Sequence, residues 1–172
     1  MPQSCVMKLS ISLVCSLLLT GSVIAGTPNV SLQLHVGTEN QTTDRKAVEE
    51  TRARWLTVRV TNSSSENLAG LELPWTLYAD DLKRGTDGVV EEKSGIERFS
   101  VEASGRYTDV TTSKVPFKWT PQHSERNGTS RRASYKRVPE SGHRYHGYVV
   151  KVVKDGTVIG EACSDPSLRK LE

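Results

Sequence analysis

The chain has 172 residues, a hydrophobic fraction of 35% and a formal net charge of +3. A length in this range fits one domain that buries its own core without external staples. A nearly balanced charge favours no particular class of partner, so only the distribution of charges along the chain is informative about binding.

Residues 7–26 have the features of a secretory signal peptide. Lys8 provides a positive start, residues 9–24 are mostly apolar, and Val23-Ile24-Ala25 precedes a cleavage site expected after Ala25. The apolar run is shorter than the roughly 20 residues of a membrane-spanning helix and is interrupted by serines and threonines. This favours a cleaved signal over a membrane anchor. We therefore expect residues 1–25 to be removed and the mature protein to be secreted or periplasmic, without a membrane span.

The cysteines argue against a disulfide framework. Cys5 and Cys15 lie within the predicted signal peptide, so Cys163 would be the only thiol of the mature chain. No intrachain disulfide is then expected, although the compartment would permit one. A lone cysteine is most often a small buried hydrophobic residue, with an intermolecular bridge or a reactive thiol as the alternative.

The first part of the mature chain alternates apolar and polar residues, which predicts extended strands. Residues 37–50 are polar, with a short helical turn expected around 45–50. Pro74 lacks an N–H and predicts an edge position or a bulge, and Ser94-Gly95 predicts a break between two short strands. The strands expected here cover residues 30–36, 56–61, 71–77, 89–90 and 96–101.

The second part of the chain continues the strand pattern. Residues 121–129 are expected to form a loop. Asp155-Gly156 lies between two β-rich runs and predicts a hairpin, because such a turn needs positive φ at its central residues. The strands expected here cover residues 107–115 with an extension through Phe117 and Trp119, then 135–138, 148–153 and 157–162.

No helical hydrophobic stripe occurs after residue 53. About seven to nine short strands separated by turns predict an all-β fold, an antiparallel β-sandwich. We expect a single domain over residues 26–163. Residues 164–172 contain Pro166 and are expected to form a short C-terminal tail that packs loosely at most.

The segment Gly142-His143-Arg144-Tyr145, followed by alternating valines, resembles the tyrosine corner of immunoglobulin-like and fibronectin type III domains. The resemblance covers residues 138–152. It implies an immunoglobulin-like sandwich in which the hydroxyl of Tyr145, or alternatively of Tyr148, bonds to upstream backbone.

The same resemblance implies a buried tryptophan on an early strand, a place that Trp55 or Trp75 would take. The chain lacks the pair of cysteines that joins the two sheets of antibody-type domains, so a domain of that type is not expected. Domains of this kind serve mostly in recognition and architecture, but a fold does not establish a function.

Catalytic and metal-binding patterns are weak. His143 and His146 are three residues apart, which in an extended chain sends their side chains to opposite faces, and zinc needs three or four converging ligands. We expect these residues and His123 to be exposed histidines in loops. Cys163 lacks an activating context, and no serine lies in a nucleophile-elbow sequence. We therefore expect no enzyme activity, no metal and no cofactor.

The segment from His123 to His146 concentrates positive charge. It holds six basic residues against Glu125 and Glu140, interleaved with tyrosines. Guanidinium groups bind carboxylate, sulfate and phosphate with paired hydrogen bonds, so this basic loop is the candidate site for an anionic glycan or another polyanion. The alternative is that the charges are solvated and keep strand edges from pairing. The candidate binding residues are Arg126, Arg131, Arg132, Tyr135, Lys136, Arg137 and Arg144.

Four of the five asparagines lie in glycosylation sequons: Asn29, Asn40, Asn62 and Asn127. In a eukaryotic secretory pathway these would be surface glycosylation sites. The short, Lys-led signal and the lack of disulfides favour a bacterial protein, in which the sequons have no such role.

The sequence thus favours an exported, non-catalytic β-sandwich with a binding or structural role at the cell surface or in the periplasm. A purely structural assembly subunit, joined to a protein partner through an exposed strand edge, is one alternative. A small secreted hydrolase is the other, and it would require a concave pocket that brings His143 or His146 to a carboxylate.

Overall fold

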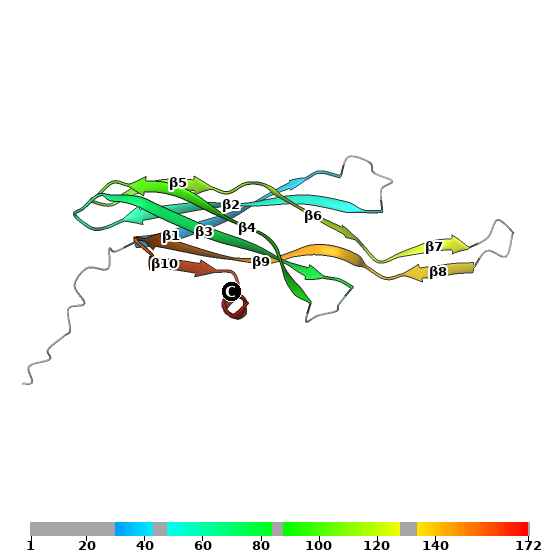
Figure 1. Cartoon of the computed structure of the whole chain (residues 1–172). Helices are drawn as coiled ribbons and strands as arrows, with labels where there is room; N and C mark the ends of the chain where they lie inside the picture. Colours follow the sequence, from blue (N-terminus) through cyan, green and yellow to red (C-terminus); the bar gives the residue numbers. More distant parts are fainter. Residues whose placement is uncertain (1–29, 43–47, 84–87, 128–133, 172) are drawn as a thin grey trace, which may run out of the picture.

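The computed structural model describes residues 30–42, 48–83, 88–127 and 134–171. All strand pairs among them are antiparallel, so the predicted all-β antiparallel fold is confirmed. The predicted signal peptide lies outside these residues, and none of their helices is long and apolar enough to span a membrane. The elements (Figure 1) are β1 (Val30–Asn40), β2 (Glu50–Asn62), β3 (Leu68–Asp81), β4 (Val89–Val101), β5 (Arg106–Thr111), β6 (Val115–Thr120), β7 (His123–Asn127), β8 (Ser134–Val138), β9 (Ser141–Lys154), β10 (Thr157–Cys163) and the 3-10 helix η1 (Pro166–Lys170).

The strands form two groups that meet at one junction. In the first group, β2 pairs with β1 along one edge and with β5 and β6 along the other. In the second group the order is β4-β3-β9-β10. The end of β6 pairs with the start of β9, where Trp119 lies opposite Gly142. Beyond this junction the chain continues into the separate β7–β8 hairpin (Figure 1).

The main hydrophobic core contains buried residues of both groups. Leu56, Val58 and Val60 of β2 belong to the same cluster as Leu73 and Leu77 of β3. Alternation along β2 places these three side chains on one face of the strand, since successive side chains point to opposite faces. The core therefore fixes which face of each strand points inward.

The final β9–β10 hairpin follows the sequence-based prediction. Asp155 and Gly156 form its turn with φ values of 49° and 77°. The predicted strand over residues 107–119 is instead divided in two. Thr112 separates β5 from β6, and its N–H donates to Leu56 O while its side-chain Oγ1 accepts from Leu56 N, at 2.9 and 3.0 Å.

The predicted strand break at Ser94-Gly95 and the predicted edge position of Pro74 are both wrong. β4 runs unbroken through Gly95, because the glycine leaves room for the indole of its cross-strand partner Trp75: a Cβ there would lie 2.7 Å from the ring. Pro74 lies on an interior strand rather than an edge, since β3 pairs with both β4 and β9. β9 pairs with Glu72 and Trp75 but with neither residue between them, which accommodates the missing N–H of the proline.

Two other segments also differ from the prediction. Glu50, expected in a helical turn over residues 45–50, begins strand β2, and residues 43–47 lie outside the described part of the chain. The predicted loop at residues 121–129 contains β7, because its residues 123–127 pair with β8. The turn chemistry of the surrounding serines, glycine and proline hid this strand.

The predicted loose C-terminal tail is a packed element. Leu168 of η1 is 1% exposed and clusters with Tyr78 and Val149. The side chain of Asp165 caps η1 by accepting from Ser167 N at 2.8 Å. Arg169 pairs with Glu161 of β10 at 2.7 Å. One buried leucine in a short polar sequence was too weak a signal to predict this packing.

The sequon asparagine Asn62 has a structural role. It is fully buried, and its side-chain amide donates to Glu66 O at 2.7 Å and to Glu102 O at 3.2 Å. Its Oδ1 accepts from the backbone N and the hydroxyl of Ser64. Asn62 thus satisfies backbone groups at the end of β2, and its amide nitrogen is inaccessible to a glycosylating enzyme in the folded protein.

Candidate functional site

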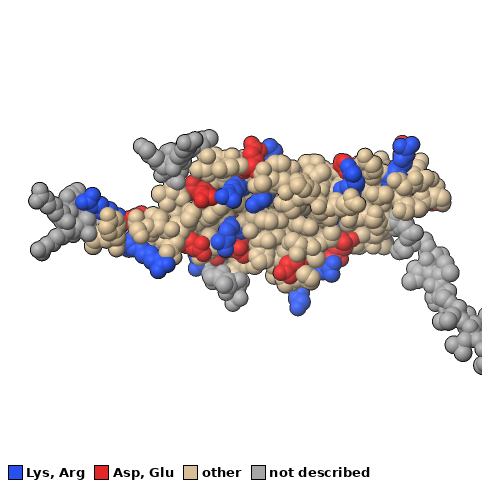
Figure 2. Space-filling model, turned by 180° about the vertical axis from the view of Figure 1, so that it is seen from behind, with Lys and Arg blue, Asp and Glu red and all other residues tan. Residues whose placement is uncertain are grey.

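The basic segment forms an antiparallel hairpin instead of a loop. β7 and β8 pair only with each other among the described strands, and they extend beyond the ends of the other strands (Figure 1). Seen from behind, Lys and Arg side chains occupy the hairpin at the left end of the molecule (Figure 2). The chain enters the hairpin from β6 and leaves it into β9, so the β6–β9 junction is its root.

The register divides the basic residues between two faces. Arg126 lies opposite Tyr135, and Ser124 lies opposite Arg137. Because directly opposed residues share a face and successive residues alternate, Arg126, Tyr135 and Arg137 lie on one face of the hairpin. We call these three residues the Arg–Tyr face. Tyr135 is 72% exposed.

Lys136 lies on the other face, directly opposite Glu125. The His123 ring also contacts Glu125, with Nε2 3.3 Å from Oε1. Lys136 and Arg137, which we expected to act together, are therefore on opposite faces, since they are neighbours in an extended strand. Arg131 and Arg132 lie outside the described residues.

Arg144 is not part of the hairpin. It lies on β9, where it borders a pocket of about 180 Å³ at the hairpin root. We call this the root pocket. The other residues that line it come from β2, β6 and β9: Arg52, Arg54, Phe117, Trp119 and Tyr145.

Two arginines lie over aromatic rings of the root pocket. The guanidinium carbon of Arg52 lies 5.2 Å from the centre of the Trp119 ring, and that of Arg54 lies 5.2 Å from the centre of the Tyr145 ring. Both distances are within the range of a cation–π contact. A guanidinium held over a ring by such a contact can still present N–H groups to a planar or tetrahedral anion.

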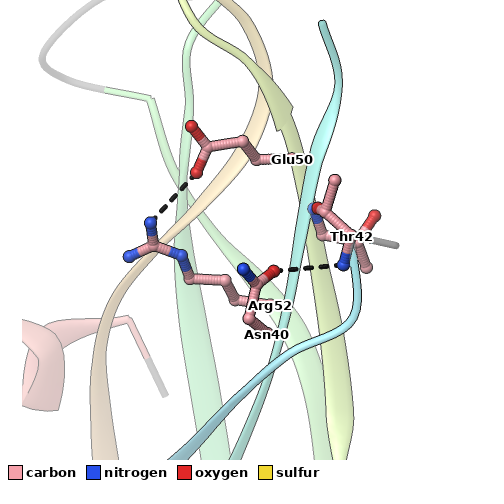
Figure 3. A network of polar contacts seen from close by, with 5 residues as sticks. Asn40, Thr42, Glu50 and Arg52 are labelled. Atoms are coloured by element: carbon pink, nitrogen blue, oxygen red, sulfur yellow. Dashed lines mark hydrogen bonds and ion pairs between the residues drawn. The ribbon is translucent and has the colours of Figure 1, made fainter. Parts of the chain in front are cut away.

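The three arginines differ in their carboxylate partners. Arg52 pairs with Glu50 at 3.0 Å, close to the hydrogen bond that joins Asn40 and Thr42 (Figure 3). Arg144 lies 3.7 Å from Asp80 and 3.6 Å from Glu140, longer than a hydrogen bond.

Arg54 has no carboxylate within ion-pair distance among the described residues. The positive charge of the root pocket is therefore least compensated at this residue.

Strand alternation explains why these arginines meet. The pairing of β2 with β1 has no register shift, so Arg52 and Arg54 lie on the same face as Leu56, Val58 and Val60. The two arginines thus extend the core-facing row of β2 side chains to the place where the core ends. Arg52 and Arg54 occupy positions of the alternating pattern that face the core, and this could have been recognised in the sequence. Sequence analysis missed it because the strand predicted there begins only at residue 56.

Tyr145 forms one wall of the root pocket. Its ring meets Phe117 edge to face, with ring centres 5.5 Å apart. The upstream hydrogen bond implied by the tyrosine-corner resemblance is not among the hydrogen bonds of the described residues. Burial, reinforced by Tyr148 and opposed by Arg54, raises the pKa of Tyr145 to about 12.

This shift predicts a loss of stability in alkali. The unfolded chain releases the tyrosine proton near the ordinary pKa of about 10, whereas the folded protein keeps it up to a pKa of about 12. Between these values the unfolded state binds fewer protons, so the free energy of unfolding falls as pH rises. Urea unfolding measured below and above about pH 10 checks this. The Tyr145→Phe variant should lose less stability across the same interval, and equal losses would contradict the prediction.

The histidines predicted to lie in loops lie on strands: His143 and His146 on β9 and His123 on β7. His143 Nδ1 lies 2.7 Å from Glu92 Oε2, and His146 Nδ1 lies 2.7 Å from Asp80 Oδ1. His143 and Glu92 border a second pocket of about 380 Å³ together with Lys118. This meets the geometric condition set for a hydrolase, although no serine, threonine or cysteine is among its lining residues.

Cys163 is a free, half-buried thiol packed beside the Leu168 cluster. Within the described ranges, no group of three or more His, Cys, Asp and Glu side chains is arranged to hold a metal ion.

The sequence matches no protein-family model, and no curated protein matches it. Several solved chains are similar to this one, and two of them illustrate the low identity. A crystal structure described as the ApaA protein from Bordetella pertussis is 16% identical, with 78% of this chain and 92% of that chain covered and a TM-score of 0.34. An X-ray structure of the structural genomics target SoR45 is 14% identical, with 67% and 85% covered and a TM-score of 0.32. At these TM-scores neither similarity supports an argument about function.

Proposed function

We propose that this protein is an exported, non-catalytic binding domain, secreted or periplasmic, that holds anionic polymers such as an anionic glycan on its β7–β8 hairpin. The observation that supports the proposal most is the register of the hairpin, which gathers Arg126, Tyr135 and Arg137 on one face. The apolar run of residues 9–24 supports export.

The chemistry of the Arg–Tyr face suits a polyanion. Arg126 and Arg137 are diagonal neighbours, roughly 7–8 Å apart by sheet geometry, so they can contact successive anionic groups of one chain. Tyr135 adds an exposed ring on which a sugar can rest. The hairpin projects from the body (Figure 1), which leaves a long polymer free to cross it.

We also propose that the two groups of strands form an immunoglobulin-like sandwich. The order β4-β3-β9-β10 corresponds to the C′-C-F-G order of one sheet in that family. The group of β1, β2, β5 and β6 would correspond to the second sheet. Trp75, 3% exposed on β3, takes the place of the buried tryptophan. The shared core cluster supports the packing of one group on the other.

A hydrolase is the second candidate function. The contact of His143 with Glu92 beside a pocket favours it, because a carboxylate orients a histidine for proton transfer. Binding is preferred because the hairpin needs no further group to act, whereas no serine, threonine or cysteine is among the residues that line this pocket. An assembly role through strand edges would be insensitive to salt, unlike polyanion binding.

Retention on a heparin column across a salt gradient tests the proposal. The double variant Arg126→Gln/Arg137→Gln should elute at lower salt and bind heparin about ten- to hundredfold more weakly, because it loses two charge-assisted contacts. The Tyr135→Ser variant should show a smaller loss.

Lys136→Gln is the matched control, because it removes a positive charge from the opposite face of the same hairpin. It should change retention much less than Arg137→Gln does. Equal effects of the two single variants would mean that only net charge matters. No retention of the unmodified protein at low salt would end the proposal.

A further inference from the structure

We infer that the root pocket is a second, separate binding site that holds a single oxyanion: a carboxylate, phosphate or sulfate group. Its arginines, Arg52 and Arg54 of β2 and Arg144 of β9, belong to other elements than the hairpin. The inference goes beyond the proposed function, because the root pocket would bind a small free anion without any polymer.

Arg54 is the residue on which the site depends. It has no carboxylate partner among the described residues, and it is held by its cation–π contact with Tyr145. A half-buried arginine without a carboxylate partner among the described residues is expected to take an anion, since charge-assisted, bidentate hydrogen bonds are the strongest that its guanidinium can form.

Arg52 and Arg144 can contribute without breaking strong contacts. Arg144 lies 3.6 and 3.7 Å from its two carboxylates, and its side chain is 49% exposed. The partner of Arg52 is Glu50, whose side chain is 37% exposed. Exposed ion pairs of this kind contribute little, so a bound anion can compete for the N–H groups of both arginines.

The walls and the size of the root pocket limit what it takes. Phe117, Trp119 and Tyr145 form an apolar side, where reduced access of water strengthens electrostatic attraction. Its volume of about 180 Å³ is below the roughly 300 Å³ at the lower end of small-molecule sites. The root pocket therefore fits one anionic group and not a whole nucleotide or oligosaccharide.

A purely structural role is the alternative: the arginines would close the end of the core and cover aromatic rings. That role requires the cation–π contacts but no anion affinity. The two possibilities differ in one measurable property, which is saturable binding of a small oxyanion.

The test titrates the purified protein with glucuronate, inorganic phosphate and sulfate in separate experiments at constant ionic strength, maintained with chloride. Isothermal calorimetry and tryptophan fluorescence report binding. We expect saturable binding of at least one anion, and the anion that binds most tightly shows whether the root pocket prefers a carboxylate, a phosphate or a sulfate group. Trp119→Phe should reduce the fluorescence response while calorimetry still detects binding.

Arg54→Gln should weaken binding at least tenfold. Arg54→Lys keeps the charge but loses the paired N–H groups, so it should also weaken binding and serves if the glutamine variant does not fold. The Arg126→Gln/Arg137→Gln hairpin variant should bind the small anion normally.

Absence of saturable binding of all three anions, or undiminished binding by the folded Arg54 variants, would overturn the inference. Neither result affects heparin retention by the hairpin, so failure of this inference and failure of the proposed function are distinguishable.

Discussion

Replacing Gly142 by alanine is expected to lower the free energy of unfolding by about 2–6 kcal/mol. Gly142 has a φ of +100°, a left-handed conformation that residues with a Cβ rarely adopt. A Cβ at this position would lie 2.5 Å from the backbone oxygen of Lys118 and 2.9 Å from the Cα of Trp119. Both atoms belong to the backbone of β6, which cannot rotate away as a side chain can. Urea unfolding of the two proteins measures the loss.

Gly156→Ala is the matched control for the conformational part of this loss. Gly156 also has positive φ, +77°, but apart from its two chain neighbours no described residue has an atom within 4 Å of the place that a Cβ would take, so its replacement adds strain without a collision. It should lose about 1–3 kcal/mol. If the two variants are destabilised equally, the close approach of β6 to β9 contributes nothing to stability.

The same contact explains why Gly142 matters for the site. Gly142 pairs with Trp119 where the two groups of strands meet, and Trp119 lines the root pocket. A folded Gly142→Ala protein would hold β6 further from β9 and should weaken any binding that depends on the pocket.

The strands that could be predicted from the sequence are those whose alternation is uninterrupted. In β1 the alternating apolar residues Val30, Leu32, Leu34 and Val36 pack against the core, and in the last hairpin Asp155-Gly156 signals its own turn. The predictions that failed depend on contacts distant in sequence. Gly95 continues its strand because of Trp75 across the sheet, and Thr112 divides a strand because it bonds to Leu56.

The candidate site was predictable only in part, because its composition is local in the sequence whereas its geometry depends on strand pairing. The basic composition of residues 126–144 could be read directly, but the faces of the hairpin depend on which residue opposes which. A shift of one residue would exchange the faces, so register alone decides that Arg137 accompanies Arg126 and that Lys136 opposes Glu125.

The root pocket was less accessible to sequence analysis. Arg52 and Arg144 are far apart along the chain, and only the β6–β9 junction brings their strands to one pocket. The inward parity of Arg52 and Arg54 was visible in the sequence. Whether these positions are buried in the core or line a pocket depends on where the opposite group of strands ends, and this cannot be read from the sequence.

Phe117→Ala is expected to lower the free energy of unfolding by about 3–5 kcal/mol. Phe117 is fully buried and is the largest of the completely buried side chains. Its removal leaves a cavity between the two groups of strands and removes the edge-to-face contact with Tyr145. The loss is a large part of the roughly 5–15 kcal/mol that stabilises a typical domain. Denaturant unfolding measures it.

Two further variants separate the causes. Phe117→Leu retains most of the buried volume but loses the ring contact, so it should be destabilised less than Phe117→Ala. Ile96→Ala removes an apolar side chain that is 61% exposed on β4, and it should change stability by no more than about 0.5 kcal/mol. If Phe117→Ala resembles Ile96→Ala, β6 does not pack into the core as described. The wall of the root pocket would then lack its support, because the ring of Tyr145 rests on Phe117 and the guanidinium of Arg54 rests on Tyr145.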